Sequence, residues 1–162
     1  MTETNLQKNP GFLMRRMQQV SVSIFLKQLR ELDMTPLQYT VLRIIEAQPG
    51  IDQITVAAEA ALDTSTVKDI VARLEAKGLV ARETSKEDRR KRSVSLTETG
   101  AALLAEAQPK VRSAQQALLA PLPASEQEKL LDLLQRLLAA HEDAPSNSDA
   151  TVPWRRFGSP SS

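Results

Sequence analysis

Residues 63–97 of the chain have the sequence DTSTVKDIVARLEAKGLVARETSKEDRRKRSVSLT, and this stretch decides the fold class. Asp63 or Thr64 can cap a helix, because a short oxygen-bearing side chain accepts hydrogen bonds from the free amides of the first turn. The apolar residues that follow recur at i, i+3, i+4 and i+7, which is one face of a helix: Val67, Ile70, Val71 and Leu74. Gly78 stands where a helix needs a left-handed C-terminal cap. We therefore predict a helix that ends just before Gly78.

Two short strands with a basic loop between them follow this helix. Residues 79–83 are apolar and then charged, and residues 93–96 alternate polar and apolar side chains. Positions 82–92 hold six basic residues and three acidic ones: Arg82, Lys86, Arg89, Arg90, Lys91 and Arg92, with Glu83, Glu87 and Asp88. The whole chain has a net charge of only +1, so positive charge is concentrated in this hairpin. A basic hairpin tip suits phosphates and a narrow minor groove. The simpler alternative is a solvated charged turn, which the preceding helix disfavours.

A helix-turn-helix precedes the hairpin. Thr35 followed by Pro36 is typical of a helix start, and the helical pattern continues to about residue 48. Asp52 opens a short helix that is joined to the next one by a tight turn at residues 61–63. Residues 35–97 are therefore predicted to form a winged helix-turn-helix, which makes the fold class mainly α with a small β-hairpin wing (α+β).

Long apolar helices flank this unit. Residues 12–32 are apolar on more than one side, and a helix from Thr97 to about residue 119 contains Pro109, which predicts a kink or break. The last helix is predicted to start at Ser125. Leucines cover nearly two thirds of its circumference: Leu130, Leu131, Leu133, Leu134, Leu137 and Leu138.

These flanking helices carry more apolar surface than one small reading domain buries. We therefore predict a homodimer whose helical dimerisation region comprises residues 11–34 and 98–141; packing within the monomer is the alternative. The chain is expected to be one structural domain with a flexible N-terminus at residues 1–10. Residues 142–162 are rich in Ser, Pro, Asp and Asn and are expected to be disordered, with no required role for residues 154–157.

Three motifs occur in order along the chain. They are LEAKGLV at residues 74–80, DRRKR at 88–92 and LTETG at 96–100, preceded by LDMTPLQY at 32–39. Together they resemble the multiple-antibiotic-resistance-regulator (MarR) family of bacterial transcription factors over roughly residues 10–141. The resemblance implies a homodimer that binds double-stranded DNA at a pseudo-palindromic operator.

A narrower resemblance rests on PGFLMRR at residues 10–16 and PGIDQ at residues 49–53. These segments resemble the branch of the family that represses aromatic-acid catabolism, and nicotinate-degradation repressors answering to 6-hydroxynicotinate in particular. The resemblance implies a repressor that a small aromatic acid releases from its operator.

The candidate DNA-binding residues lie on the predicted recognition helix and wing. On the helix they are Thr64, Ser65, Thr66, Lys68 and Arg73, and on the wing they are Lys86, Arg89, Arg90 and Arg92. The N-terminal end of the helix can touch base edges and phosphates, whereas Arg73 lies two turns further in and suits the backbone. Thr66 has the alternative role of a partly buried capping residue. By its place in the family's pattern, Asp88 is expected to hold the wing's shape by pairing with an arginine.

The candidate ligand-binding residues combine a cation, hydrogen-bonding groups and an apolar slot, as an anionic aromatic ligand requires. Arg16, Gln19 and Ser23 lie at i, i+3 and i+7 on one helix. Apolar and aromatic side chains could supply the slot: Phe12, Met14, Met17 and Tyr39. The alternative is that the arginines at 15 and 16 are surface charges or intersubunit ion pairs, and that Tyr39 is core.

Composition excludes several other classes of protein. The chain has no cysteine, a single histidine at His141, and no nucleophile, P-loop or dinucleotide motif, so we expect neither an enzyme nor a metal or cofactor site. It has no run of 18 apolar residues and no secretory signal, which is compatible with a bacterial cytoplasmic protein without a membrane partner. Two rivals remain: a ligand-independent winged-helix repressor, and a winged-helix module for protein interaction or DNA architecture.

Overall fold

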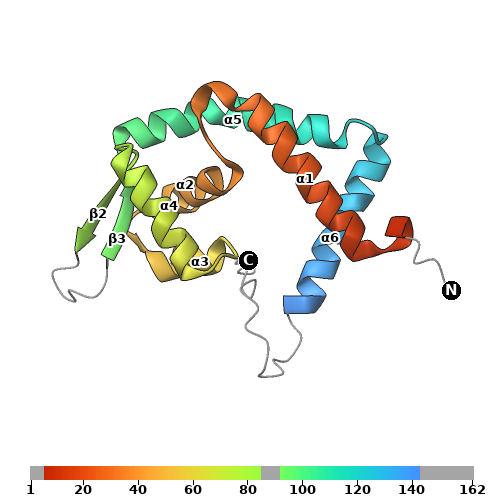
Figure 1. Ribbon diagram of the computed structural model, residues 1–162, viewed down its shortest axis with the longest axis horizontal. Coiled ribbons are helices and arrows are strands. Elements are labelled where there is room, and N and C mark those ends of the chain that lie inside the picture. Colours follow the sequence, from red (N-terminus) through yellow and green to blue (C-terminus); the bar gives the residue numbers. More distant parts are fainter. Residues whose placement is uncertain (1–5, 85–91, 143–162) are drawn as a thin grey trace.

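The computed structural model describes residues 6–84 and 92–142 of the chain. Helices make up most of it, and one small antiparallel sheet completes it, which confirms the predicted fold class (Figure 1). In chain order the elements are η1 (Leu6–Lys8), α1 (Pro10–Gln28), η2 (Arg30–Leu32), α2 (Pro36–Ala47), β1 (Ile51–Asp52), α3 (Gln53–Glu59), α4 (Thr64–Ala76), β2 (Val80–Thr84), β3 (Arg92–Leu96), α5 (Glu98–Leu119) and α6 (Ala124–Glu142).

Side-chain caps fix the starts of the helices in the winged-helix unit. Thr35 Oγ1 accepts a hydrogen bond from the backbone N–H of Gln38 at 3.2 Å, and Gln38 Oε1 accepts one from the N–H of Thr35 at 3.0 Å. The carboxylates of Asp52 and Asp63 cap α3 and α4 by accepting hydrogen bonds from backbone N–H groups of the first turn. The cap of α4 is therefore Asp63, and Thr64 is the first helical residue.

The long helices differ from the prediction in two respects. The first helix ends at Gln28, not near residue 32, because the chain turns through η2 and Asp33, whose φ of 45° is left-handed. This turn buries Leu29 and Met34. Of the kink or break predicted at Pro109, the break does not occur, because α5 runs continuously through it. Ala105 and Pro109 are both exposed, so water can reach the Ala105 carbonyl that proline leaves without an N–H partner.

The sheet has three antiparallel strands in the order β1-β3-β2. Val80 pairs with Leu96 at the base of the β2–β3 hairpin, and Ile51 of β1 pairs with Val94 on the other edge of β3. The two-residue strand β1 was not predicted. It is held by backbone pairing, to which Gly50 adds an N–H that donates to the Val94 carbonyl at 3.1 Å.

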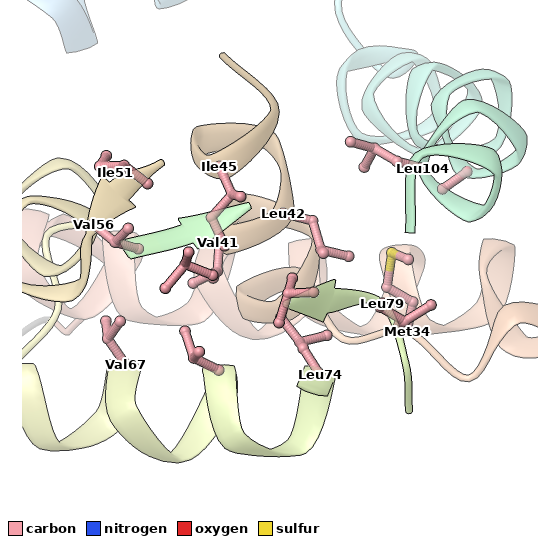
Figure 2. Packing of buried hydrophobic residues seen from close by; sticks show 14 of the residues in the cluster. Met34, Val41, Leu42, Ile45, Ile51, Val56, Val67, Leu74, Leu79 and Leu104 are labelled. Atoms are coloured by element: carbon pink, nitrogen blue, oxygen red, sulfur yellow. The ribbon is translucent and has the colours of Figure 1, made fainter. Parts of the chain in front are cut away.

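The hydrophobic core lies inside the winged-helix unit and is aliphatic. Figure 2 shows Val41, Leu42 and Ile45 of α2 facing Val67 and Leu74 of α4. Further side chains come from β1, α3, the residue before β2, and α5, namely Ile51, Val56, Leu79 and Leu104. Helix α5 thus reaches the core through one face, with Leu104, Ala107 and Val111 buried, whereas α1 has no fully buried residue.

A close backbone approach joins the start of α5 to the base of the wing. A Cβ on Gly100 would lie 1.9 Å from the carbonyl oxygen of Leu79, so no other residue fits without a shift. The Thr97 hydroxyl donates to the Gly78 carbonyl at 2.7 Å and accepts from the Gly100 N–H at 3.0 Å. The LTETG motif is therefore a joint between wing and long helix.

Outside the winged-helix unit, α1 crosses α5, and α6 follows from the far end of α5 (Figure 1). Large apolar side chains on α1 and α6 are 39–53% exposed: Leu13, Met14, Met17, Val20 and Leu26 on α1, and Leu131, Leu133, Leu134, Leu137 and Leu138 on α6. Among the described residues, no helix is both long and apolar enough to span a membrane.

Candidate nucleic-acid interface and effector region

Helix α4 separates its side chains into a buried face and an exposed polar face. Val67, Val71 and Leu74 are 0–1% exposed and fix the helix on the core. The side chains that the sequence assigned to DNA lie on the outside: Thr64, Ser65, Lys68 and Arg73 are exposed, and Thr66 is half-buried. The helix therefore presents hydroxyl groups at its N-terminal end and cations further along.

Asp63 organises the N-terminal end of α4. The hydroxyl of Ser65 donates to one carboxylate oxygen of Asp63, while the Thr66 hydroxyl and N–H donate at 2.6 and 2.8 Å. These bonds, led by the one from Ser65, hold the pKa of the Asp63 carboxyl well below its ordinary range. The Thr66 hydroxyl thus serves the helix cap, as the alternative for that residue proposed.

Lys68 and Arg73 have their charged groups unpaired within the part of the chain that the structure describes. Both side chains are exposed and have no ion-pair partner among the described residues. By contrast, Arg82 at the base of the wing pairs with Glu75 of α4, whose hydrogen bond raises the pKa of the guanidinium. Arg82 therefore fastens β2 to α4, and the cations available on the helix are those at positions 68 and 73.

The tip of the predicted wing lies outside the described residues. This holds for Lys86, Arg89, Arg90 and the pairing assigned to Asp88. Arg92 is described only as the backbone start of β3, opposite Thr84. The described strands establish the hairpin on which the basic segment is carried.

The residues assigned to a ligand fall into two groups. At the start of α1, the guanidinium carbons of Arg15 and Arg16 lie 5.8 and 6.0 Å from the centre of the half-buried Phe12 ring. Met14, Gln19 and Ser23 are exposed along the same helix.

Tyr39 belongs to a different place. Its ring lies edge-on to Phe25, with centroids 5.9 Å apart, at the border of the core. Phe25 follows Phe12 by 13 residues, which is about 20 Å along a helix. One chain thus does not bring Tyr39 to Phe12 and Arg16. Phe25 itself was not among the candidates, because its spacing marks it only as part of an apolar stripe.

No group of three or more His, Cys, Asp or Glu side chains in the described ranges is arranged to hold a metal ion.

The features present are a helix-turn-helix, a two-stranded wing and a recognition helix with an exposed polar face. They define a winged-helix DNA-binding protein. The family model described as MarR family matches residues 32–91. The chain belongs to the MarR family.

Similar sequences are transcriptional regulators. The transcriptional regulator HosA of Escherichia coli is 38% identical over 106 residues, which cover 65% of this chain and 78% of HosA. The HTH-type transcriptional repressor NicR of Pseudomonas putida is 32% identical over 143 residues, covering 88% of this chain and 90% of NicR. The chain is therefore a transcriptional regulator and not an enzyme.

Similar solved structures include ligand-bound and DNA-bound regulators. PcaV from Streptomyces coelicolor, in complex with its natural ligand, is 33% identical with a TM-score of 0.77 over 87% of this chain and 99% of PcaV. BpsR of Bordetella bronchiseptica, whose DNA binding is regulated by 6-hydroxynicotinic acid, is 30% identical with a TM-score of 0.77 over 86% and 96%. The repressor CouR bound to a 23-mer DNA duplex is 28% identical with a TM-score of 0.78 over 85% and 97%.

Proposed function

We propose that this regulator is a homodimeric repressor that binds a pseudo-palindromic operator and is released by a small aromatic acid. The best candidate for the effector is 6-hydroxynicotinate or a related hydroxylated aromatic acid. The observation that carries the proposal is the exposed polar face of α4, whose cations at positions 68 and 73 have no ion-pair partner among the described residues, on a helix otherwise fixed in the core. The protein would act in the bacterial cytoplasm, where its operator lies.

The exposed helices support the dimer. In the single chain, no described residue of α6 is buried, and Leu134, Leu137 and Leu138 are 39–53% exposed. The first half of α1 likewise leaves Leu13 and Met17 about half exposed. Since water-exposed leucine stripes are costly, a second copy is the partner that fits them. In this arrangement residues 11–34 and 98–141 form the dimerisation region and residues 35–97 form each reader.

Each reader would place α4 in a major groove, with half-sites about one helical turn apart. Thr64, Ser65 and Lys68 would meet base edges and phosphates at the start of the helix, and Arg73 would meet backbone. Thr66 would act through the cap. The basic residues of the wing would reach phosphates and the minor groove: Lys86, Arg89, Arg90 and Arg92.

The effector would bind along α1. Arg16, whose guanidinium carbon lies 6.0 Å from the centre of the Phe12 ring, supplies the cation. Phe12 supplies a flat apolar wall, and Gln19 and Ser23 supply hydrogen bonds. Met14 would close the slot at the exposed end. Because Tyr39 packs on Phe25, which lies about 20 Å along α1 from Phe12, Tyr39 would complete a slot that is shared between two copies.

An operator titration tests this function. DNA upstream of the protein's own gene would be titrated at two salt concentrations, with and without 6-hydroxynicotinate and a panel of benzoates. We expect tight, salt-dependent binding that one acid abolishes. Tight binding that ignores every acid would leave a ligand-independent repressor, and absence of specific binding at both salts would leave an interaction or architectural module.

A further inference from the structure

The segment between α1 and α2 covers a cavity that none of the residues assigned to DNA or effector lines. Its volume is about 200 Å³, and five of its eight lining residues are aliphatic. Met34 contributes from the segment itself, Leu74 from the C-terminal end of α4 and Leu103 from α5. The cavity thus lies where the long helices, the α1–α2 segment and the recognition helix meet.

Lys77 is the one cationic residue among the eight that line the cavity. Lys77, the C-cap residue of α4, lines the cavity, and its Nζ donates to Asp33 Oδ2 at 2.7 Å and to the Asp33 carbonyl at 3.3 Å. The hydrogen bond and charge of Lys77 lower the pKa of the Asp33 carboxyl. The pair connects the α1–α2 segment to the end of the recognition helix.

This pair is exchangeable, because the Asp33 side chain is 91% exposed and that of Lys77 is 43% exposed. Exposed ion pairs contribute little to stability, since water solvates both partners. A second carboxylate that also places an apolar body in the cavity has an advantage over Asp33, which offers only its charge. The third polar side chain at the cavity, Gln38, has its carbonyl engaged by the Thr35 N–H at 3.0 Å.

We propose that this cavity is a second small-molecule site, which takes a monocyclic carboxylic acid of about the size of benzoate. Its ring would lie among Met34, Leu74 and Leu103, and its carboxylate would replace Asp33 on Lys77. The size fits, because an apolar cavity of about 150 Å³ holds benzene. Occupation separates the α1–α2 segment from the end of α4. The site goes beyond the proposed effector site on α1 and shares no residue with it.

The methionines of the chain allow the two sites to be observed separately. Met34 lines the cavity, whereas Met14 and Met17 lie on the exposed face of α1. The full-length protein, carrying ¹³C-methyl methionine, would be titrated with benzoate and followed by NMR. Benzamide, which has the same shape without the charge, is the control ligand. We expect a saturable shift of the Met34 methyl with benzoate and binding roughly tenfold weaker with benzamide.

Two conservative variants test the role of the ion pair. Lys77→Gln should weaken benzoate binding at Met34 roughly tenfold, and Asp33→Asn should tighten it about two- to fivefold by removing the competitor. Asparagine tolerates the left-handed φ of 45° at position 33, so this variant keeps the fold.

The second site would be overturned if benzoate left the chemical shift of the Met34 methyl unchanged. It would also be overturned if both variants bound benzoate at Met34 with the affinity of the unchanged protein. Shifts confined to Met14 and Met17 would overturn it while supporting the effector site on α1. Shifts confined to Met34 would support the second site and count against the α1 site, so the two proposals fail separately.

Discussion

Gly100 occupies a position where the backbone leaves no room for a side chain. Because its Cα faces the Leu79 carbonyl, Gly100→Ala would force a backbone shift at the joint between wing and α5. We expect the free energy of unfolding to fall by about 1–3 kcal/mol, as for overpacked cores. Urea unfolding followed by circular dichroism measures this change.

Gly11→Ala is the matched control. A Cβ at Gly11 would meet Asn9 Oδ1 at 3.5 Å, which is an ordinary contact, and the residue lies in the first turn of α1. Its stability should stay the same or rise slightly, because alanine favours a helix. If both variants unfold at the same urea concentration, the close approach at Gly100 is not a constraint.

Asp63 gives the fold a dependence on acid pH. Its carboxyl has a pKa below the ordinary value of 3.8 in the folded protein, because Ser65 and Thr66 donate to the ionised form. The stabilisation is therefore fully present above pH 3.8 and is lost as the pH falls below it toward the folded pKa. We expect Asp63→Asn, which keeps a capping oxygen, to show a smaller loss of melting temperature between pH 5 and pH 2 than the unchanged protein.

At the scale of single residues, local chemistry made the helix ends of the winged-helix unit predictable. Thr35 and Asp52 cap their helices as predicted, and Gly78 has the left-handed φ of 70° that its position required. The roles of Gly100 and Lys77 were not predictable, because each depends on a contact with a residue about 20 or more positions away. Sequence spacing contains no information about such contacts.

At the scale of elements, α4 is the part that should read DNA. Lys68→Ala should weaken operator binding and lower the salt slope by about one, the value for one lost phosphate contact. Fluorescence anisotropy at several salt concentrations measures both effects. Lys27→Ala, which removes another exposed lysine from the end of α1, should change neither.

Thr66→Ala separates capping from reading within the same helix. Because the Thr66 hydroxyl donates to Asp63 at 2.6 Å, its loss should lower the melting temperature. The preference of the protein for particular operator bases should stay the same. A variant that keeps its melting temperature but accepts altered operator bases would instead make Thr66 a reading residue.

The existence and type of the helices could be predicted from periodicity, but two of their details could not. Pro109 predicted a kink or break by its local chemistry, yet no break occurs, because burial of Leu104, Ala107 and Val111 on one side keeps α5 continuous. The strand Ile51–Asp52 is too short for any pattern and exists only because β3 offers a free edge. Tertiary packing decides both cases.

At the scale of the whole molecule, the exposed leucines predict the association of two chains. Leu134→Glu should convert the dimer to a monomer and weaken operator binding at the same time, because a buried unpaired charge is costly. Analytical ultracentrifugation measures the oligomeric state. Ile54→Glu is the control, since Ile54 is 72% exposed on α3, away from the leucine stripes, and should leave the oligomeric state unchanged. An unchanged sedimentation coefficient for Leu134→Glu would remove α6 from the interface.

The division into a reader and long flanking helices followed from the sequence, whereas the spatial relation of the candidate ligand residues did not. Periodicity placed Arg16, Gln19 and Ser23 on one helix, but the path of the chain between α1 and α2 decides what faces them. The turn at Asp33 sends Tyr39 back to Phe25, far from Phe12.

The unbroken course of α5 has a mechanical consequence. Its 22 residues span about 33 Å from the base of the wing to the turn before α6. Because α5 is one continuous helix and Gly100 packs against the Leu79 carbonyl near its start, a tilt of about 5° at that end displaces the other end by about 3 Å. A small tilt of α5 thus moves its far end by a distance comparable to the rise of one base pair, without any change in the shape of the helix.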